Sequence, residues 1–158
     1  MDKLLKLLDT NARLSNAELA VMTGSTEDEV AKQIAAWEKD GVIRAYKALV
    51  DWDRTDREYV TAIIELRVTP KRDAGFEAIA QTIAAWEEVE SIYLMSGGYD
   101  FSIVVTGRTF KEVAMFVANR LSTLDSVVST ATHFVLRKYK DKGVVYGAPE
   151  VDERGYFI

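Results

Sequence analysis

The stretch that decides the fold of the N-terminal part is Ser25–Ile43, STEDEVAKQIAAWEKDGVI. Its large apolar residues Val30, Ile34 and Trp37 follow one another at intervals of four and three, which places their side chains on one face of an α-helix. Gly41 can end this helix, because glycine readily adopts the left-handed conformation that follows many helices. The stretch therefore predicts an amphipathic helix with one buried face.

Two capping boxes mark helix starts in this region. Thr26 and Glu29 form one of them, and Ser15 and Glu18 form the other. In a capping box the hydroxyl oxygen accepts from one backbone N–H, and the carboxylate three residues later accepts from another. We therefore expect a short helix over Ala17–Met22 and a longer helix that begins after Thr26.

The surrounding residues complete a small domain over residues 1–50. Residues Asp2–Thr10 contain four leucines on one helical stripe, which predicts a first helix. Val42–Tyr46 and Ala48–Val50 are short apolar runs that we interpret as a β-ribbon. Three helices followed by a ribbon are typical of a winged helix-turn-helix domain.

The second part of the chain follows a different period. Residues 51–58, DWDRTDRE, are dense in charge and predict a linker. Alternating and helical patterns then predict a ferredoxin-like β-α-β-β-α-β domain over 59–138, so the fold class is α+β. The expected elements are the strand Tyr59–Val68, the helix Asp73–Trp86, the strands Val89–Met95 and Tyr99–Val105, the helix Thr109–Leu121 and the strand Ser126–Arg137. For the tail, 139–158, we expect little regular structure.

Composition narrows the classes of function. The 158 residues include no cysteine, which excludes disulfides, thiolate metal sites and cysteine nucleophiles. His133 is the only histidine, and no nucleophile or second histidine partners it, so we expect no enzyme. We also expect no metal site and no cofactor. No apolar run approaches a signal peptide or a membrane helix, so the expected location is cytoplasmic. The formal net charge of −5 argues against unspecific coating of nucleic acid, although a local contact surface remains compatible with it.

Four segments in order resemble the Lrp/AsnC family of transcription regulators. They are LSNAELA at 14–20, EKDGVI at 38–43, MSGGYDFSIVV at 95–105 and STATHFVL at 129–136. The resemblance implies a DNA-binding domain followed by an ACT-like domain for effector binding and oligomerisation. It also implies a homodimer, often assembled further into an octamer, and an amino acid as the effector.

The second helix of the expected helix-turn-helix is acidic for a DNA-binding element. Residues 27–40 hold five acids and two lysines, which leaves a formal charge of −3. The helix has no arginine for the commonest specific contact, which is made to guanine. The candidate DNA-binding residues are Lys32, Gln33 and Ala36 on the helix and Arg44 and Lys47 on the ribbon. Lys32 can hold phosphate, Gln33 can contact adenine, and the ribbon cations can contact the DNA backbone.

Gly97, Gly98, Tyr99 and Asp100 are the candidate effector turn. Glycine N–H groups can bind the carboxylate of an amino acid, and Asp100 can accept a bond from its ammonium group. The alternative is a simple tight turn in which the glycines supply positive φ angles. Three residues of the last strand can line the same pocket or can be there for their strand propensity: Ser129, Thr130 and Thr132.

Two functions follow from these observations. One is a sequence-specific DNA-binding regulator that responds to an amino acid or a related small molecule. The alternative is an amino-acid-sensing and oligomerisation module with weak or no DNA binding of its own. The acidic helix favours the alternative, whereas the two complete capping boxes favour the regulator. The operator, the effector and the direction of regulation do not follow from the residues.

Overall fold

The computed structural model describes residues 2–70 and 75–147. By its internal contacts the chain divides into two compact units, Met1–Val50 and Asp51–Ile158. Each unit has its own core of buried apolar side chains, so each is described by itself.

The first unit consists of α1 (Asp2–Thr10), α2 (Asn16–Thr23) and α3 (Glu27–Lys39). The predicted bounds of α1 are confirmed, and α2 extends one residue beyond the prediction at each end. Val30 and Trp37 of α3 are buried as predicted, and Ile34 packs against them. Their partners in the core come from the other two helices and are Leu4, Leu8, Leu19 and Ala20.

Both predicted capping boxes are present. At α2 the Glu18 N–H donates to Ser15 Oγ over 3.2 Å, and the Ser15 N–H donates to Glu18 Oε2 over 2.8 Å. At α3 the corresponding distances between Thr26 and Glu29 are 3.3 and 2.9 Å. These bonds satisfy N–H groups that the first turn of a helix leaves without a partner, so they fix where α2 and α3 begin.

The predicted ribbon after α3 is wrong. The helix ends as expected, with Gly41 at a φ of 69°. Among the described residues, however, 42–50 form no strand. A strand needs a neighbouring backbone for its ladder of hydrogen bonds, and apolar alternation alone does not supply one. The segment is instead fastened by the Tyr46 hydroxyl, which donates to Glu38 Oε1 over 2.8 Å.

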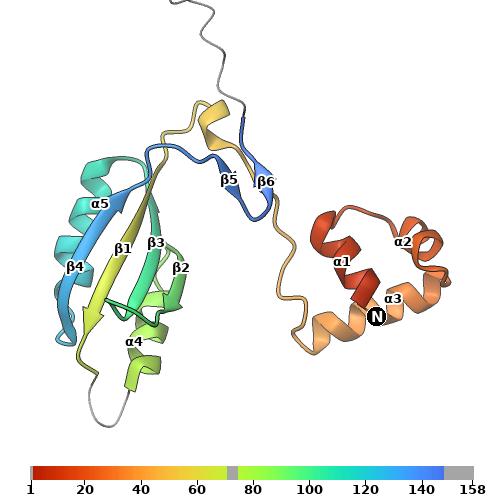
Figure 1. The fold of residues 1–158 in the computed structure, drawn as a ribbon, viewed down its shortest axis with the longest axis horizontal. Helices are drawn as coiled ribbons and strands as arrows, with labels where there is room; N and C mark the ends of the chain where they lie inside the picture. The colour runs from red at the N-terminus through yellow and green to blue at the C-terminus, as the bar shows by residue number, and fades with distance from the viewer. Residues whose placement is uncertain (1, 71–74, 148–158) are drawn as a thin grey trace, which may run out of the picture. The chain divides into compact units, whose positions relative to one another are not determined.

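The second unit is built on an antiparallel four-stranded sheet of order β2-β3-β1-β4. Its strands are β1 (Val60–Val68), β2 (Val89–Leu94), β3 (Phe101–Gly107) and β4 (Val127–Phe134). The helices α4 (Gly75–Ala84) and α5 (Phe110–Phe116) pack against one face (Figure 1). This confirms the predicted ferredoxin-like arrangement.

Several bounds differ from the prediction. The strand expected to start at Tyr99 starts at Phe101, because Tyr99 and Asp100 belong to the turn. The helix expected over Thr109–Leu121 is α-helical only in α5 and continues as a π-helical turn, η2 (Val117–Leu121). The predicted start of the preceding helix at Asp73 lies outside the described residues.

Residues 51–59 contain one short 3₁₀ turn, η1 (Trp52–Arg54). The Arg57 guanidinium lies over the Trp52 ring, 4.5 Å from its centroid, and within 5.6 Å of the Tyr59 ring centroid. Such contacts hold a charged segment in one local conformation.

The described part of the tail, residues 139–147, contains one short regular element, at residues 140–145. Here β5 (Lys140–Asp141) and β6 (Val144–Val145) form a hairpin. Lys142 and Gly143 have φ angles of 44° and 84°, which suit a two-residue hairpin turn. Residues 148–158 lie outside the described part. Within the described ranges, no helix is long and apolar enough to cross a membrane, and no group of three potential metal ligands is present.

Acid should weaken the first unit through its two capping carboxylates. The backbone N–H groups of Ser15 and Thr26 lower the pKa of Glu18 and Glu29 below the ordinary 4.5. A lowered folded pKa gives stability that is complete above the ordinary pKa and is lost as the pH falls through the folded pKa. Amide hydrogen exchange of α2 and α3 should therefore accelerate in acid, and less so in a Glu18→Gln/Glu29→Gln variant. Equal acid sensitivity of both proteins would contradict this role.

Candidate nucleic-acid interface and effector turn

Helix α3 presents one solvent-facing stripe on the side away from its core. Lys32 and Ala36 are one helical turn apart and both are exposed, whereas Gln33 is half-buried at the edge of the stripe. The structure therefore brings two of the three predicted helix residues together on one surface. Gln33 can reach a base only with the part of its side chain that remains accessible.

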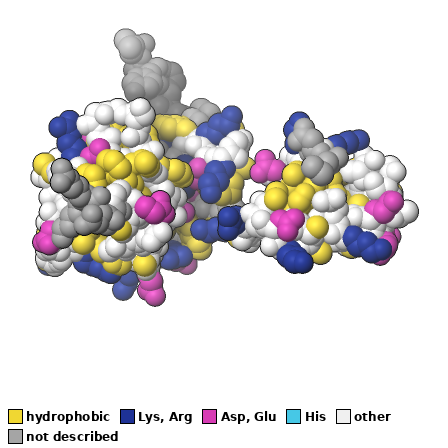
Figure 2. Space-filling view, turned by 90° about the horizontal axis from the view of Figure 1, so that it is seen from below, with side chains coloured by type: hydrophobic (Ala, Val, Ile, Leu, Met, Phe, Trp, Pro, Cys, Tyr) yellow, Lys and Arg dark blue, Asp and Glu magenta, His cyan; other side chains and the backbone are white. Residues whose placement is uncertain are grey.

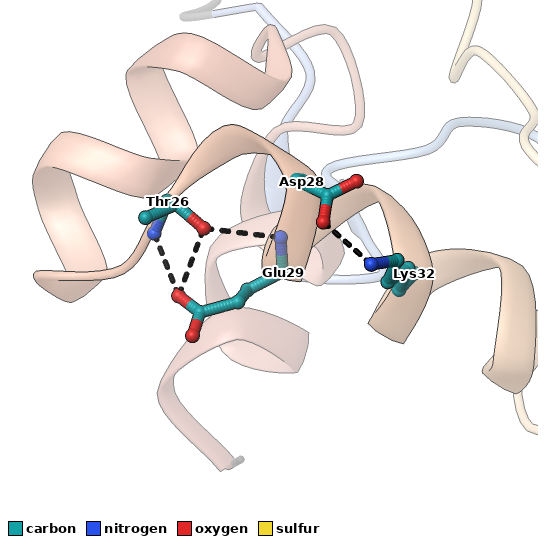
Figure 3. Close-up of polar contacts among 4 residues, drawn as sticks. All are labelled: Thr26, Asp28, Glu29 and Lys32. Atoms are coloured by element: carbon teal, nitrogen blue, oxygen red, sulfur yellow. Dashed lines mark hydrogen bonds and ion pairs between the residues drawn. The ribbon is translucent and has the colours of Figure 1, made fainter.

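One cation of this stripe, Lys32, is paired with an acid of its own helix, and Lys39, seven residues further on, is also exposed. Lys32 Nζ lies 2.6 Å from Asp28 Oδ2, and the two side chains are 75% and 74% exposed (Figure 3). An exposed pair at this spacing is worth only about 0.3–0.5 kcal/mol, so a phosphate group can replace Asp28 as the partner. The pair lowers the positive charge that α3 offers to DNA without removing Lys32 from the surface.

The other acids of the first turn differ in their roles. Figure 3 shows Glu29 turned back to Thr26, where its carboxylate accepts the capping bonds. Glu27 is exposed and takes no part in the capping box. Two N–H groups at the helix start, those of Thr26 and Glu29, are therefore bonded within the chain, which leaves less of the N-terminus to bind a phosphate.

The two cations beyond α3 lie on an extended segment rather than on a ribbon. A Cβ atom added at Gly41 would lie 3.3 Å from Arg44 Cζ, so the Arg44 guanidinium covers the end of α3. Lys47 is exposed, one residue after Tyr46. Partial burial, and secondarily the bond to Glu38, raise the pKa of Tyr46, which keeps its hydroxyl a donor at neutral pH. In the view of Figure 2, basic and acidic side chains are interspersed over the smaller unit.

In the second unit, Asp100 is bonded to the strand beside its turn. The Val68 N–H donates to Asp100 Oδ2 over 2.8 Å, and the Asp100 N–H donates to the Leu66 carbonyl over 2.9 Å. These bonds lie where the pairing of β1 with β4 shifts register, between Arg67 and Val68. Asp100 thus holds the turn against the end of β1, and one of its two carboxylate oxygens is already used.

Gly97 and Gly98 are exposed and do not have the left-handed φ angles that a tight turn would require. The alternative explanation of these glycines by positive φ is therefore wrong. Among the described residues, no atom lies within 4 Å of a Cβ atom added at either position. Nothing in the described part of the subunit requires glycine here. An approach of a ligand or a second chain to the bare backbone would require it.

The three residues of β4 do not share one surface. Thr130 lies opposite Leu66 and Thr132 opposite Ile64, so both point to the helix-covered face. Ser129 lies opposite Arg67 and points to the other face. Tyr99, within the turn, is half-buried. Ser129 and Thr130 are at the same end of the sheet as the turn, whereas Thr132 is two residue pairs further from it than Thr130.

Comparison with known proteins gives a family for both units of the chain. The family model for the Lrp/AsnC ligand binding domain matches residues 61–145, and the model for a winged helix-turn-helix DNA-binding domain matches residues 3–44. The chain belongs to the Lrp/AsnC family. It is a transcriptional regulator with a DNA-binding unit and a ligand-binding unit.

The relatives agree with this assignment over nearly the whole chain. The uncharacterised HTH-type transcriptional regulator YugG of Bacillus subtilis is 48% identical over 153 residues, which cover 96% of this chain and 92% of YugG. The leucine-responsive regulatory protein of Rhizobium meliloti is 27% identical and covers 88% of this chain and 88% of its own. A Neisseria meningitidis transcriptional regulator solved with L-Met is 25% identical, with a TM-score of 0.72 over 88% of this chain and 89% of that one.

Two features of the interface were missed in the sequence. The Asp28–Lys32 pair was visible as an i, i+4 spacing of opposite charges, which favours an ion pair on a helix. The Tyr46–Glu38 bond joins residues eight positions apart. No local sequence pattern predicts this bond, because it depends on how the chain turns at Gly41.

Replacement of Asp28 tests how α3 meets DNA. Asp28→Asn frees Lys32, and we expect affinity for a promoter fragment to rise at least about twofold per head. Lys32→Ala should lower the slope of log affinity against log salt by about 0.9 per head, and it should cost more affinity in the Asp28→Asn background than in the wild type. Fluorescence anisotropy at several salt concentrations measures all four proteins.

Glu27→Gln is the matched control, because it removes the same charge from the same turn without freeing Lys32. Its effect should be additive with that of Lys32→Ala. If Glu27→Gln and Asp28→Asn behave alike, Asp28 acts only through its charge and the ion pair has no specific role.

Gly98→Ala tests the effector turn without disturbing the subunit. The added methyl group meets no described atom and the φ angle is ordinary, so the melting temperature should be unchanged or slightly higher. We expect calorimetric binding of the effector amino acid at this turn to be lost. Gly143→Ala, at a φ of 84°, should instead lower stability by about 1 kcal/mol. Normal amino-acid binding by Gly98→Ala would mean that nothing approaches the turn closely.

Proposed function

We propose that the protein binds specific promoter DNA as a homo-oligomer with linked heads, and that a free amino acid changes this binding. The observation that carries the proposal is the exposed stripe of α3, fixed by a complete capping box and bearing one exchangeable lysine, Lys32. A head with so few cations has low intrinsic affinity. Linking several heads raises their effective concentration on neighbouring half-sites and compensates for this weakness.

The face of the sheet opposite α4 and α5 supports an oligomer. On this face, the large apolar residue Ile63 of the central strand β1 is 40% exposed, and Tyr93 of the edge strand β2 is 54% exposed. His133 Nε2 lies 3.5 Å from Glu65 Oε1 on the same face. An open sheet face with apolar centres is commonly buried against a second layer. A second copy offers that layer, with the same mixture of apolar and charged groups.

The turn at Gly97, Gly98 and Asp100 supports an amino-acid effector. Its backbone is accessible, and its geometry is held by the bond between Asp100 and Val68. The printed names of two relatives, a leucine-responsive protein and a regulator in complex with L-Met, make an amino acid the effector we propose for this chain. Ser129 lies at the same end of the sheet and is our candidate for a further polar contact, with Thr130 on the other face.

The proposed function involves no catalysis, no metal and no cofactor, and we place it in the cytoplasm, where promoter DNA is accessible. The second candidate is a sensing and oligomerisation module with little DNA affinity. The observation that favours it is the pairing of Lys32 with Asp28, which reduces the positive charge that α3 offers to DNA.

A titration of the protein's own promoter fragment decides between the two candidates. We expect saturable, sequence-dependent anisotropy at low salt, a change in affinity when amino acids are added, and a dimer or larger assembly in light scattering at micromolar concentration. Ile63→Asp on the open face should lower both the assembly state and the DNA affinity. The absence of saturable binding at low salt, with and without amino acids, would leave the sensing module as the better account.

A further inference from the structure

The second unit contains a cavity of about 470 Å³ that is far from the effector turn. It lies between α5, the C-terminal end of β3 and residues 57–59. The turn at Gly97–Asp100 precedes the other end of β3. Because β3 has seven residues and a strand rises about 3.4 Å per residue, about 20 Å separate the two ends. The cavity is therefore a separate place in the fold.

The floor of the cavity is apolar and firmly built. Val105 and Val113 are buried, Phe116 is 7% exposed, and Met115 is 46% exposed at the margin. A Cβ atom added at Gly107 would lie only 3.0 Å from Val113 Cγ2, so β3 and α5 are in close contact beneath the cavity. Such a floor suits an apolar side chain of a small ligand.

Most charged groups around this floor are already occupied. The Arg120 guanidinium donates to both carboxylate oxygens of Glu88, over 2.7 and 2.8 Å, and lies 4.6 Å from the centroid of the Trp86 ring. Glu112 accepts from the Arg108 backbone N–H over 2.8 Å at the start of α5. These groups shape the wall, and their charges are satisfied within the protein.

Arg108 and Glu58 differ from the other charged groups. Their closest nitrogen and oxygen atoms are 3.8 Å apart, which is too far for a hydrogen bond, and the side chains are 76% and 68% exposed. A guanidinium and a carboxylate held loosely above an apolar floor match the two charges of a zwitterion. A ligand that inserts between them exchanges one poor ion pair for two charge-assisted hydrogen bonds.

We propose that this cavity is a second binding site, for a free amino acid with an apolar side chain. The ligand carboxylate binds the Arg108 guanidinium, its ammonium group binds the Glu58 carboxylate, and its side chain packs on Met115 and Phe116. As a regulatory site it rests on the proposed function, since it adds a second point at which a small molecule controls the DNA-bound assembly.

The helix that walls the cavity provides independent support. After α5 the chain continues as the π-helical turn η2, which supplies Asn119 and Arg120 to the cavity lining. A π-helical turn is less stable than the α-helix it interrupts and is found frequently at functional sites. Here it places Arg120 where the guanidinium reaches Glu88.

Binding at this site would also affect the residues that connect β1 to the N-terminal part of the chain. Glu58 lies in residues 51–59, which precede β1 and belong by their contacts to the sheet-bearing unit. A ligand that bridges Glu58 and Arg108 ties these residues more firmly to the end of β3. The heads of an oligomer then search a smaller volume, which changes their effective concentration on DNA.

The experiment is a titration of the full chain with L-leucine, L-methionine and L-phenylalanine, followed by amide chemical shifts. The Gly98→Ala variant serves as the background, because it removes binding at the turn. We expect saturable shifts at Gly107 and Asn119 for at least one of the three amino acids. The corresponding 2-oxo acid and amino-acid amide, which each lack one charge, should bind at least about tenfold more weakly.

Three variants and one control complete the test. Arg108→Gln and Glu58→Gln should each weaken binding about tenfold or more, and Met115→Trp should abolish it by filling the cavity. Lys111→Gln, on α5 but outside the cavity lining, should bind within about twofold of the background. Unchanged circular dichroism confirms that each variant is folded.

The outcomes separate this inference from the proposed function. Shifts confined to residues 95–100 in the wild type, with none near Gly107, would overturn the second site and leave the proposed function intact. Shifts near Gly107 that survive Met115→Trp or Arg108→Gln would also overturn it. No amino-acid binding anywhere would remove the effector from the proposed function as well, whereas DNA binding is tested separately by the promoter titration.

Discussion

The N–H groups in the first turn of α3 need hydrogen-bond acceptors, and in the function we propose the same turn must approach DNA, a polyanion. The organisation of the protein depends on how these two requirements are combined. Carboxylates stabilise the positive end of a helix and repel DNA for the same electrostatic reason. Glu29 provides an acceptor at the helix start, because its carboxylate accepts the Thr26 N–H in the capping box. Asp28 is bound to Lys32, so that pair contributes no net charge, and we propose that DNA phosphate displaces the acid. The head is therefore well defined in structure and weak in electrostatic attraction.

The weak electrostatic attraction of the head to DNA gives the second unit its role in the function we propose. In the function that we propose, the heads make few phosphate contacts and gain specific binding when they are linked, and the open face of the sheet is the surface we propose for that link. The two binding sites that we propose for small molecules lie at the two ends of β3. At one end Asp100 fixes a turn whose glycine backbone is accessible, and at the other a cavity opens beside the segment that leads to the head.

Much of this arrangement could be predicted from the sequence, because it is encoded locally. The capping boxes, the apolar spacing in α3 and the alternation in β1 each involve residues within a few positions of one another. The missing ribbon at 42–50 shows the limit of such patterns, since a strand also needs a partner that no local pattern guarantees. The hairpin at 140–145 was missed although Lys142-Gly143 signals a tight turn, because its strands are only two residues long.

The candidate sites were less predictable than the fold. The residues of the turn were found, but the role of Asp100 depends on Val68, 32 positions away, and on a register shift in β1. Ser129 and Thr130 were grouped by composition, whereas the alternation of a strand places them on opposite faces. The cavity beside α5 gathers residues from four separate segments, and no motif connects them.

The central claim is that the exposed stripe of α3 enters the DNA groove despite its acidic start. The chain has no cysteine, so Ala36→Cys creates a single attachment point on that stripe for an iron–EDTA cleavage reagent. Val21→Cys on α2, where the native side chain is 85% exposed, is the matched control. The account predicts that the Ala36 conjugate cuts promoter DNA at a few adjacent positions in each half-site, and that the Val21 conjugate cuts weakly and diffusely. Focused cleavage from Val21 with none from Ala36 would contradict it.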